Sequence, residues 1–388
     1  MQSCSCDLSL RQLEKSLLGR VSLTDMKVLD QKDLRILQAL ERMGGNASAP
    51  EIAETLTPTI PARTIRYRLS KLMERGILLP TFIQTCERKI GLGQQILVVQ
   101  EYQKRSEDLE QLIRDLPLFY WYVPTHGKFD GHLIHSVYDV NDSDTVLKIA
   151  ESMKSGGFIH DYYTFDILDY RTKKVDFSKY DPDGDWSWDW KNWIDTLQDD
   201  NQESSISAQA WCNDKNPISY DAIDIKLVRA LKRDADMTIS DLVALTDCSI
   251  AEVRDRIQRL RDKGVIKGYR RAYGFVGDLL WISCFLDIRD RVDSILEKLL
   301  ELPFPGVLLL NSPSKFCLRL GMTTPHLKRF FQGFKKIRSD MNSYFFQFHL
   351  PDLVDSDFQD VFEFYEQDEG HWEIPASKYV AMVHDHQR

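Results

Sequence analysis

The 388-residue chain lacks several features that would place it in a specialised class of protein. It has no apolar run near the roughly 20 residues that a membrane-spanning helix needs, and its first thirty residues lack the apolar core of a signal peptide. Its seven cysteines are scattered and odd in number, so they predict no disulfide framework and fit a reducing compartment better. We therefore expect a cytoplasmic protein.

The sequence also lacks the spacing of a metal or cofactor site. Cys4 and Cys6 are the only close cysteine pair, and they have none of the companion ligands that close a zinc site. A metal-binding or redox role for this pair is the alternative to an inert terminus. No nucleophile–base pair, phosphate-binding loop or metal-ligand spacing is recognisable elsewhere. We expect no metal, no cofactor and no enzymatic activity.

A basic excess is missing as well. The formal net charge is −9, whereas a general polyanion binder carries a basic excess, so any contact with nucleic acid has to be local. With 43% hydrophobic and 28% charged residues, the composition is that of an ordinary folded protein. The length predicts several small modules rather than one.

What the sequence does contain is an internal repeat, at an offset of about 190 residues. The segment DLRILQALE at 33–41 returns as DIKLVRALK at 224–232, and RYRLSKLMERGI at 66–77 returns as RDRIQRLRDKGV at 254–265. Both pairs match in pattern position by position. The repeat predicts two copies of one architecture.

Each copy begins with a pattern typical of three helices and a strand. In the first copy a helix start is marked by Ser48-Ala-Pro-Glu51, and the third helix is predicted from about residue 61 to 74, where Gly76 ends it. The apolar stripe of this third helix consists of Ile65, Leu69, Leu72 and Met73. A basic helix that stops at a glycine before a hydrophobic strand is typical of a winged helix-turn-helix.

A β-α-β-β-α-β pattern follows each helical unit. In the first copy the predicted strands are 96–100, 118–124, 131–140 and 162–168, with helices at 106–116 and 144–155. In the second copy the strands are 280–288, 307–311, 315–321 and 344–349, with helices that end at 302 and span 325–339. The predicted fold class is therefore α+β, with two tandem units, each a winged helix-turn-helix plus a ferredoxin-like βαββαβ domain.

The predicted boundaries follow from these patterns. They are 1–28 for an N-terminal extension, 29–90 for the first winged helix-turn-helix, 91–175 for the first ferredoxin-like domain, 176–219 for an acidic linker rich in tryptophan, 220–275 for the second winged helix-turn-helix, 276–352 for the second ferredoxin-like domain and 353–388 for a C-terminal tail.

The linker combines acidity with aromatic residues. Between residues 181 and 203 there are eight acidic residues, one lysine and four tryptophans, Trp186, Trp188, Trp190 and Trp193. Because a purely solvated linker would not carry four tryptophans, we expect part of it to dock on a neighbouring domain. An autoinhibitory cover over a basic DNA-binding face is the alternative. In the tail, Phe358, Phe362, Phe364 and Tyr365 are typical of core or dimer packing.

Three motifs together resemble the Lrp/AsnC (feast/famine) family of regulators. They are Asp30-x-x-Asp33-x-x-Ile36-Leu37-x-x-Leu40, then Leu72-x-x-x-Gly76-Ile77, and the turn Gly127-Lys128-Phe129-Asp130. The resemblance covers roughly residues 29–170 and 220–350. It implies a sequence-specific transcription regulator that binds double-stranded DNA, dimerises through its sheets and responds to an amino-acid effector. Because one chain carries two units, we expect a pseudo-dimer within the chain or a homo-oligomer.

A helical wheel at 100° per residue identifies the side chains that could touch DNA. The predicted DNA-binding residues are Arg63, Thr64, Arg66, Tyr67, Arg68, Ser70 and Lys71 in the first copy, and Arg254, Arg256, Gln258, Arg259 and Lys267 in the second. Arginine can pair bidentately with guanine, whereas the flanking basic residues suit phosphates. The second helix also carries Glu252 and Asp255 on its outer side, so the two heads are not equivalent and a simple palindrome is not expected.

The effector site is predicted at the turn between two strands of the first copy. The residues are Gly127, Phe129, Asp130 and Gly131, because the family places its effector cleft there and glycine permits a tight turn. The second copy has Ser314-Lys-Phe-Cys317 and loses both the glycine and the aspartate. A plain hairpin turn is the alternative.

Two other functions fit the same pattern of elements. Siroheme decarboxylases share this fold and use histidines, and His126, His132 and His135 lie around the turn. However, His132 and His135 have opposite parity on a strand, so they point to opposite faces and cannot line one pocket. The other alternative is a scaffold that keeps the helix-turn-helix for protein contacts.

Overall fold

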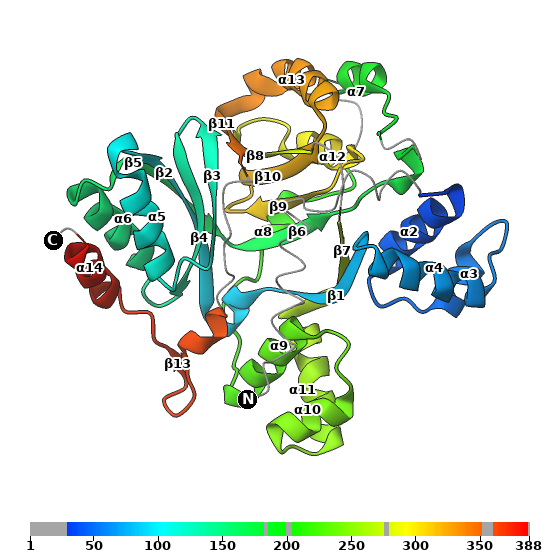
Figure 1. The fold of residues 1–388 in the computed structure, drawn as a ribbon, viewed down its shortest axis with the longest axis horizontal. Helices are drawn as coiled ribbons and strands as arrows, with labels where there is room; N and C mark the ends of the chain where they lie inside the picture. Colours follow the sequence, from blue (N-terminus) through cyan, green and yellow to red (C-terminus); the bar gives the residue numbers. More distant parts are fainter. Residues whose placement is uncertain (1–28, 182–184, 199–203, 275–278, 351–359, 387–388) are drawn as a thin grey trace.

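The computed structural model describes residues 29–181, 185–198, 204–274, 279–350 and 360–386 (Figure 1). The predictions about the N-terminal extension, Cys4, Cys6 and Phe358 lie outside these residues. The described chain has an α+β architecture with helical units of the winged helix-turn-helix kind and a large antiparallel sheet, which confirms the predicted fold class. No helix within these residues is both apolar enough and long enough to span a bilayer.

Two trihelical units, called here head 1 and head 2, repeat the same order of elements. Head 1 consists of α2 (Gln31–Met43), α3 (Ala49–Thr55) and α4 (Ala62–Glu74), and head 2 of α9 (Ala222–Arg233), α10 (Ile239–Thr246) and α11 (Ile250–Asp262). A capping box starts the first helix of each head, with Asp30 capping α2 and Asp221 capping α9. Each box satisfies backbone N–H groups that the first turn of a helix leaves without partners.

The strand that follows each head does not form a free wing. Strand β1 (Leu78–Thr85) and strand β7 (Ile266–Tyr273) pair with each other antiparallel, as a two-stranded sheet between the heads. Gly45 of head 1 lies against this sheet, because its N–H donates to the Tyr269 carbonyl at 2.9 Å and its carbonyl accepts from Arg271 Nε at 2.9 Å. A Cβ at this glycine would lie 2.4 Å from the Arg270 carbonyl carbon, so the close approach requires glycine.

Each head is followed by a β-α-β-β-α-β unit. The first unit consists of β2 (Leu92–Glu101), α5 (Ser106–Asp115), β3 (Trp121–Gly127), β4 (Gly131–Asp139), α6 (Thr145–Ser155) and β5 (Ile159–Ile167). The second consists of β8 (Leu280–Ile288), α12 (Val292–Glu301), β9 (Gly306–Leu310), β10 (Lys315–Met322), α13 (Thr324–Ile337) and β11 (Met341–His349). We call these units half 1 and half 2.

The two halves share one nine-stranded antiparallel sheet in the order β5-β2-β4-β3-β11-β8-β10-β9-β6. One seam joins β3 to β11, with Gly127 opposite Gln347. The other is made by β6 (Asp169–Lys173), which pairs with β9 of half 2 although only Leu168 separates it from β5 of half 1. Because β5 and β6 stand at the two ends of the strand order, this continuous segment closes the sheet on itself.

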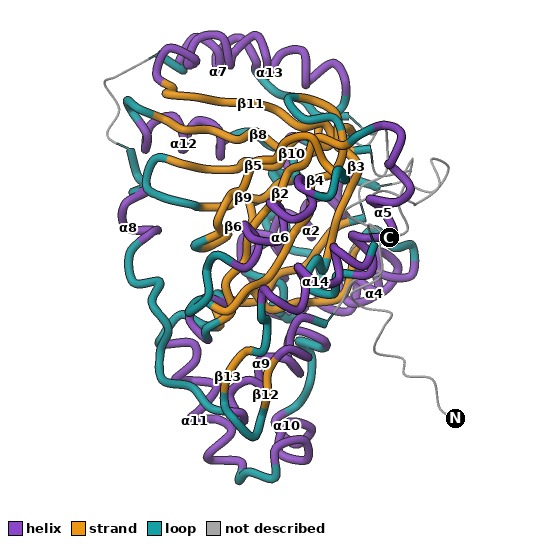
Figure 2. The backbone as a smooth tube through the Cα atoms, turned by 90° about the vertical axis from the view of Figure 1, so that its left-hand side faces the viewer, coloured by secondary structure: helices purple, strands orange, loops and turns teal. Residues whose placement is uncertain are grey.

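Closure of the sheet separates an inner apolar core from two outer cores. Inward side chains of both halves, such as Val98, Phe165, Phe285 and Leu309, form one buried inner cluster. Outside, head 1 and the outer face of half 2 share one continuous cluster, whereas head 2, the tail and the outer face of half 1 share another. Figure 2 shows α7 and α13 at one end of the molecule and α10 and α11 at the other, with the strands between them.

The linker docks on half 2, as its tryptophans predicted. Trp186, Trp190 and Trp193 are buried, and α7 (Trp190–Thr196) packs on α13, where Gly333 leaves room for the Trp193 ring. Trp193 Nε1 also donates to the Lys298 carbonyl at 2.8 Å. Helix α8 (Ala208–Cys212) leads on towards head 2. Residues 185–198 of the acidic linker are therefore a structural strap on half 2.

The remaining short elements connect these parts. They are the 3-10 helices η1 (Glu87–Ile90), η2 (Gln103–Arg105), η3 (Phe177–Lys179), η4 (Arg338–Asp340) and η6 (Val361–Phe364), the strands β12 (Tyr365–Glu366) and β13 (His371–Trp372), and α14 (Ala376–Asp385). The tail packs on half 1 and head 2 through buried Phe362, Tyr365 and Trp372, so these aromatic residues serve as core. Met73, expected in the apolar stripe of α4, is instead 43% exposed and accepts a contact from Arg271.

Candidate nucleic-acid interface

Helix α4 of head 1 presents an exposed basic face. Arg63, Arg66, Ser70 and Lys71 are exposed, and Tyr67 is 64% exposed although it is a large aromatic residue. Within the described part of the chain, Arg63 and Arg66 have no ion pair, and Lys71 pairs with Glu74 on the same helix at 2.6 Å. The opposite face holds buried Ile65 and Leu72 against the head, so packing fixes the outward direction of the basic residues.

Arg68 has a different role from the one predicted from the helical wheel. Its Nη1 donates to Asp30 Oδ2 at 2.8 Å and to Asp33 Oδ1 at 2.7 Å, so it holds the two aspartates of the α2 capping box. Thr64 is half-buried beside it on α4. The guanidinium of Arg68 thus links α4 to α2, and its assignment to DNA stays a prediction that the geometry does not favour.

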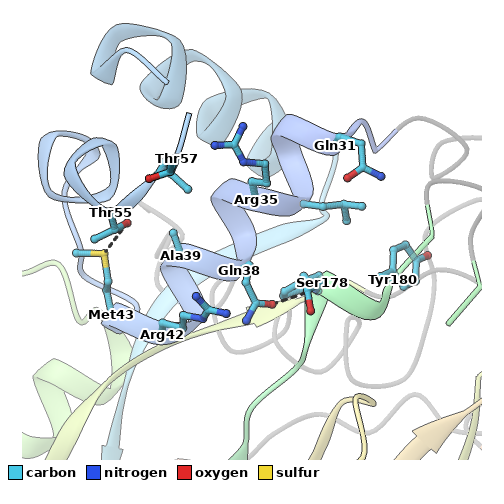
Figure 3. Close-up of a pocket in the computed structure, with 13 residues that line it drawn as sticks. Gln31, Arg35, Gln38, Ala39, Arg42, Met43, Thr55, Thr57, Ser178 and Tyr180 are labelled. Atoms are coloured by element: carbon cyan, nitrogen blue, oxygen red, sulfur yellow. Dashed lines mark hydrogen bonds between the residues drawn. The ribbon is translucent and has the colours of Figure 1, made fainter. Parts of the chain in front are cut away.

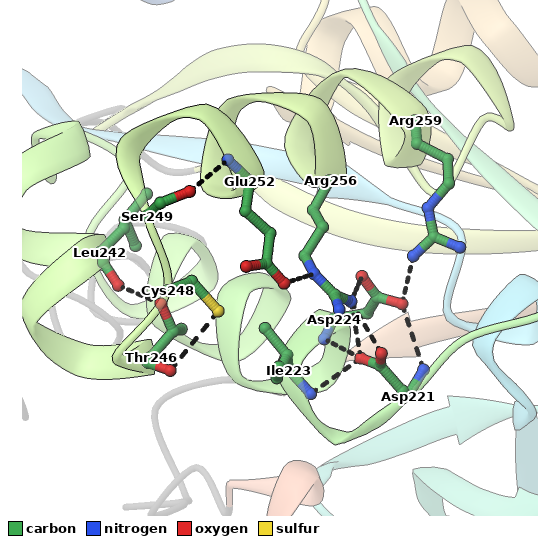
Figure 4. Close-up of polar contacts among 10 residues, drawn as sticks. All are labelled: Asp221, Ile223, Asp224, Leu242, Thr246, Cys248, Ser249, Glu252, Arg256 and Arg259. Atoms are coloured by element: carbon green, nitrogen blue, oxygen red, sulfur yellow. Dashed lines mark hydrogen bonds and ion pairs between the residues drawn. The ribbon is translucent and has the colours of Figure 1, made fainter.

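Head 2 repeats this clamp and strengthens it (Figure 4). Arg256 of α11 donates to Asp221 at 2.8 Å and to Asp224 at 3.1 Å, and it also pairs with Glu252 at 3.1 Å. Arg259 reaches the same fully buried Asp224 carboxylate. Two of the four basic or amide residues predicted to contact DNA from α11 are therefore occupied by the carboxylates of the head itself.

The other predicted residues of head 2 are divided between solvent and the interior. Arg254 and Gln258 are exposed, although Gln258 donates to Asp262 at 2.7 Å. Lys267 of β7 instead donates to the buried Asp169 carboxylate and to the Tyr170 carbonyl. It lies between the sheet of the halves and the β1–β7 pair, where it neutralises Asp169 together with Lys215.

The predicted effector turn lies at the seam between the halves. Phe129 N–H donates to Gln347 Oε1 at 3.1 Å, and Gln347 Nε2 donates back to the Phe129 carbonyl at 2.7 Å. A Cβ at Gly127 would lie 2.1 Å from the Phe346 carbonyl oxygen, so the seam requires glycine here. Asp130 accepts from His126 Nδ1 at 3.2 Å on the surface, and Gly131 begins β4. The turn is therefore first of all a contact between halves.

A shallow hollow of about 660 Å³ opens beside this turn. Its lining includes Lys128 and Phe129 of the turn, Tyr102 and Lys104, and His160 at the start of β5. Asp130, Gly127 and Gly131 do not line it. The turn thus contributes two side chains to a surface that is open to solvent.

Sequence reasoning missed a polar cluster inside the closed sheet. Arg319 of β10 donates from Nη2 to His135 Nε2 of β4 at 2.8 Å, and His135 Nδ1 lies 3.2 Å from the Tyr120 hydroxyl. Ser283 connects Arg319 Nε at 3.4 Å with His349 Nε2 at 2.8 Å. The sequence offered one signal for this cluster, which is the parity of His135 on its strand. As that parity predicted, His132 points outward instead, towards Glu101 at 3.3 Å.

No carboxylate pairs with the Arg319 guanidinium of this cluster among the described residues. Burial and the neighbouring Arg319 hold the pKa of His135 and of His349 well below the usual histidine range, so both rings are neutral near pH 7. Burial also lowers the pKa of Arg319 itself. This guanidinium stacks over the Trp121 ring with 4.9 Å between centres. The arrangement links the two halves across the interior and leaves one cation without a carboxylate partner.

Comparison with known proteins supports the helix-turn-helix assignment. Residues 220–267 match the sequence profile of the winged helix-turn-helix DNA-binding family. A search of curated protein sequences finds no match. Head 2 is therefore a winged helix-turn-helix by sequence as well as by structure.

Solved structures share the overall fold. The siroheme decarboxylase NirDL is 10% identical, with a TM-score of 0.51 over 85% of this chain and 97% of its own. A transcriptional regulator from Neisseria meningitidis, solved with L-methionine, is 22% identical, with a TM-score of 0.30 over 37% of this chain and 91% of its own. At this identity the first likeness shows the fold alone.

The first likeness nevertheless corrects the expectation that the chain is not an enzyme. That expectation rested on the lack of catalytic motifs in the sequence, but the fold that this chain shares over most of its length belongs to an enzyme. Side chains brought together from strands far apart in the sequence leave no motif at short spacing, as the cluster of His135, Ser283, Arg319 and His349 illustrates. The prediction of no enzymatic activity is therefore wrong, because a lack of catalytic motifs does not exclude an enzyme.

Proposed function

We propose that the chain is a sequence-specific transcription regulator of the Lrp/AsnC type, which binds double-stranded DNA and in which halves 1 and 2 act as a built-in pseudo-dimer. The observation that carries the proposal is the exposed basic face of α4, where Arg63, Arg66 and Tyr67 point to solvent on a helix whose other face is locked in the head. A positive helix face of this size suits the major groove of DNA.

The two heads take unequal parts in this proposal. Arg63 and Arg66 of head 1 have no competing carboxylate in the described chain, whereas Arg256 and Arg259 of head 2 are bound to Asp221 and Asp224. Head 1 therefore makes most base contacts, and head 2 contributes phosphate contacts through Arg254 and the lysines and arginines near its end. The preferred DNA site is asymmetric.

Selection of random duplex DNA with the full chain tests this division. The expected result is one strongly specified half-site, which is lost in Arg63→Ala and kept in the matched head 2 variant Arg254→Ala. Each lost bidentate contact to guanine should reduce discrimination by about 1–3 kcal/mol. Recovery of a symmetric palindrome, or equal loss of specificity in the two variants, would contradict the proposal.

An amino-acid effector in the hollow beside residues 127–131 is part of the same proposal. Lys128 and Lys104 could pair with a carboxylate there, and Phe129 and Tyr102 could contact an apolar side chain. Titration of the full chain with single amino acids, followed by tryptophan fluorescence and DNA affinity, tests it. Lys128→Ala should abolish the response, whereas no response to any amino acid would remove this part of the proposal.

A second candidate function is an enzyme that acts on a carboxylate-bearing substrate, as the siroheme decarboxylase of the same fold does. The observation that favours it is the interior Arg319, a cation without a carboxylate partner among the described residues, next to two neutral histidines. Absorbance titration of the chain with siroheme, followed by analysis of the porphyrin side chains, tests it. Binding that vanishes in Arg319→Gln would support it, and unchanged absorbance would exclude it.

A further inference from the structure

Head 1 carries an open groove along α2. In head 2, the tail turn at Asp360 contacts the corresponding side of α9. The groove has a volume of about 480 Å³ and runs along one side of α2, between the turn at Thr55–Thr57 and the 3-10 helix η3 (Figure 3). Its lining residues on α2 extend from Gln31 to Met43, which corresponds to a length of about 18 Å at 1.5 Å per residue. The groove is therefore elongated.

The charges in this groove have one sign. Arg35 and Arg42 line it, and none of the described residues that line it is acidic. Arg35 donates to the Pro58 carbonyl, whereas the described part of the chain places no carboxylate within ion-pair distance of exposed Arg42. The groove is therefore positively charged although the net charge of the chain is −9.

The arginines on the corresponding side of α9 in head 2 bind carboxylates. In the sequence match between the heads, Arg229 and Arg233 of α9 stand where Gln38 and Arg42 stand in α2. Arg229 Nε donates to Asp360 Oδ2 at 2.8 Å, Arg229 Nη2 donates to Glu363 at 3.2 Å, and Arg233 also reaches Asp360. Both carboxylates belong to η6 and its cap, a single turn of the tail whose Phe362 is buried against head 2.

The corresponding turn beside head 1, η3, makes no such ion pairs with α2 among the described residues. Like η6, the helix η3 starts after an aspartate cap, Asp176, and it lies against the first helix of its head. There, Ser178 N–H donates to Gln38 Oε1 at 3.2 Å, and Asp176 Oδ1 accepts from Ser178. Arg42 thus faces no counterpart of the Asp360 contact.

We propose that the α2 groove binds an acidic, aromatic peptide segment of a partner protein, with carboxylates on Arg42 and Arg35 and an apolar side chain on the floor. The floor includes Leu34, Leu56 and Phe177. A peptide fits better than a compact metabolite, because the groove follows about three turns of α2 and because a peptide turn supplies both carboxylates in head 2. Charge-assisted hydrogen bonds to the two arginines would set its orientation.

The groove provides its own reporter. Met43 lies at one end, 39% exposed, with its sulfur 3.8 Å from the Thr55 hydroxyl. In the full chain labelled with 13C-methyl methionine, we expect the Met43 signal to shift on addition of the peptide Asp-Val-Phe-Glu-Phe-Tyr, the sequence of residues 360–365. The signal of Met237, a half-buried residue of head 2 outside the groove, serves as the internal reference.

Matched variants decide the result. Arg42→Glu should weaken the peptide at least tenfold, and Arg35→Gln should weaken it less. Lys32→Glu makes the same change of charge on an exposed residue of α2 outside the groove and should leave the affinity unchanged. The peptide Asn-Val-Phe-Gln-Phe-Tyr should cause no shift.

Several outcomes would overturn the proposal. They are an unmoved Met43 signal at millimolar peptide, an equal shift with the peptide Asn-Val-Phe-Gln-Phe-Tyr, and full binding of the acidic peptide to Arg42→Glu. An equal shift with free glutamate at the same concentration would indicate a small-molecule site and would also overturn it. A change of the Met43 signal on removal of residues 1–28 without any peptide would assign the groove to the N-terminus of the chain itself and would also overturn it.

Discussion

The guanidinium of Arg256 on α11 donates to the carboxylate of Asp221 at 2.8 Å, so a residue of the second recognition helix secures the start of α9. Arg68 makes the same contact with Asp30 in head 1, also at 2.8 Å. The contact makes the first and third helices of each head one unit. It also removes these arginines from the set that is free to meet DNA, although their place in the sequence is that of a recognition helix.

Replacement of Arg256 by alanine should therefore destabilise the chain rather than change its DNA preference. Because Asp224 is fully buried and would keep only Arg259, we expect the free energy of unfolding to fall by about 2 kcal/mol. Exposed Arg254 has no ion pair within the described residues, so Arg254→Ala should change stability by less than about 0.5 kcal/mol. Urea denaturation of both variants measures the difference, and equal stabilities would refute the clamp.

Arg66→Ala should weaken DNA binding without changing the preferred sequence. If Arg66 contacts one phosphate, the slope of log affinity against log salt should become shallower by about one unit. Fluorescence anisotropy with the selected duplex at several salt concentrations gives both slopes. An unchanged slope would show that the exposed face of α4 does not meet the DNA backbone.

The ion pair between Glu87 and Lys232 should be a strong link between η1, which precedes half 1, and head 2. Glu87 is buried; burial alone would raise its pKa, but Lys232 outweighs this effect and lowers it. A carboxyl with a lowered pKa contributes stability above its unfolded pKa, near 4.5, and loses it as the pH falls further. Lys232→Met should lower the free energy of unfolding by about 3 kcal/mol at pH 7.

The same variant should differ less from the parent in acid, because the contribution of the Glu87–Lys232 pair is lost progressively as the pH falls below about 4.5. Denaturation at pH 7 and pH 3 with Lys226→Met, a half-buried lysine on the same helix, as the control would test this dependence. A constant difference between the two pH values would speak against a charge effect.

Glu41 should behave in the opposite way. Burial raises the pKa of this carboxyl although Tyr273 donates to it at 2.7 Å and Val175 N–H at 3.2 Å. A group with a raised pKa stabilises the fold fully below its unfolded pKa and loses this contribution as the pH rises through the folded pKa. Glu41→Gln keeps the shape, so it should be more stable than the parent at pH 7 and equal to it at pH 4. A less stable variant at pH 7 would show that the charge is needed.

Gly127→Ala should loosen the seam between the halves. A Cβ there would lie 2.1 Å from the Phe346 carbonyl oxygen, so β3 and β11 would have to move apart. We expect a loss of about 1–3 kcal/mol, as is usual for overpacking. The substitution Gly370→Ala, at an exposed turn of the tail, is a useful comparison, because the nearest atom there is 3.9 Å away and only its positive φ adds strain. Thermal unfolding compares the two, and a larger effect at Gly370 would contradict the close approach.

Local patterns in the sequence predicted most elements of this fold. The stop at Gly76, the strand at 280–288 and the helix start at Ser48 all agree with the structure, because each depends on neighbours within a few residues. The positions of β6 and of the β1–β7 pair were not predictable in this way. Their partners lie more than a hundred residues away, and short edge strands have no periodicity of their own.

The site was predictable only as far as exposure follows from a helical wheel. The wheel placed Arg63 and Tyr67 outward, where the structure also has them. It could not show that Arg68 and Arg256 bend back to the capping-box aspartates, because that contact joins residues from two helices. Nor could it find Arg319 and His135, which meet only when the two halves close on each other.

The continuous segment from β5 to β6 has a consequence for the ratio in which the two heads occur. Proteins assembled from separate subunits dissociate on dilution and can exchange subunits with related proteins, so their composition depends on concentration. Here one peptide segment belongs to the sheets of both halves, and dilution cannot separate them. The ratio of the two unlike heads is fixed at one to one at any expression level, and neither head can be replaced by one from another chain.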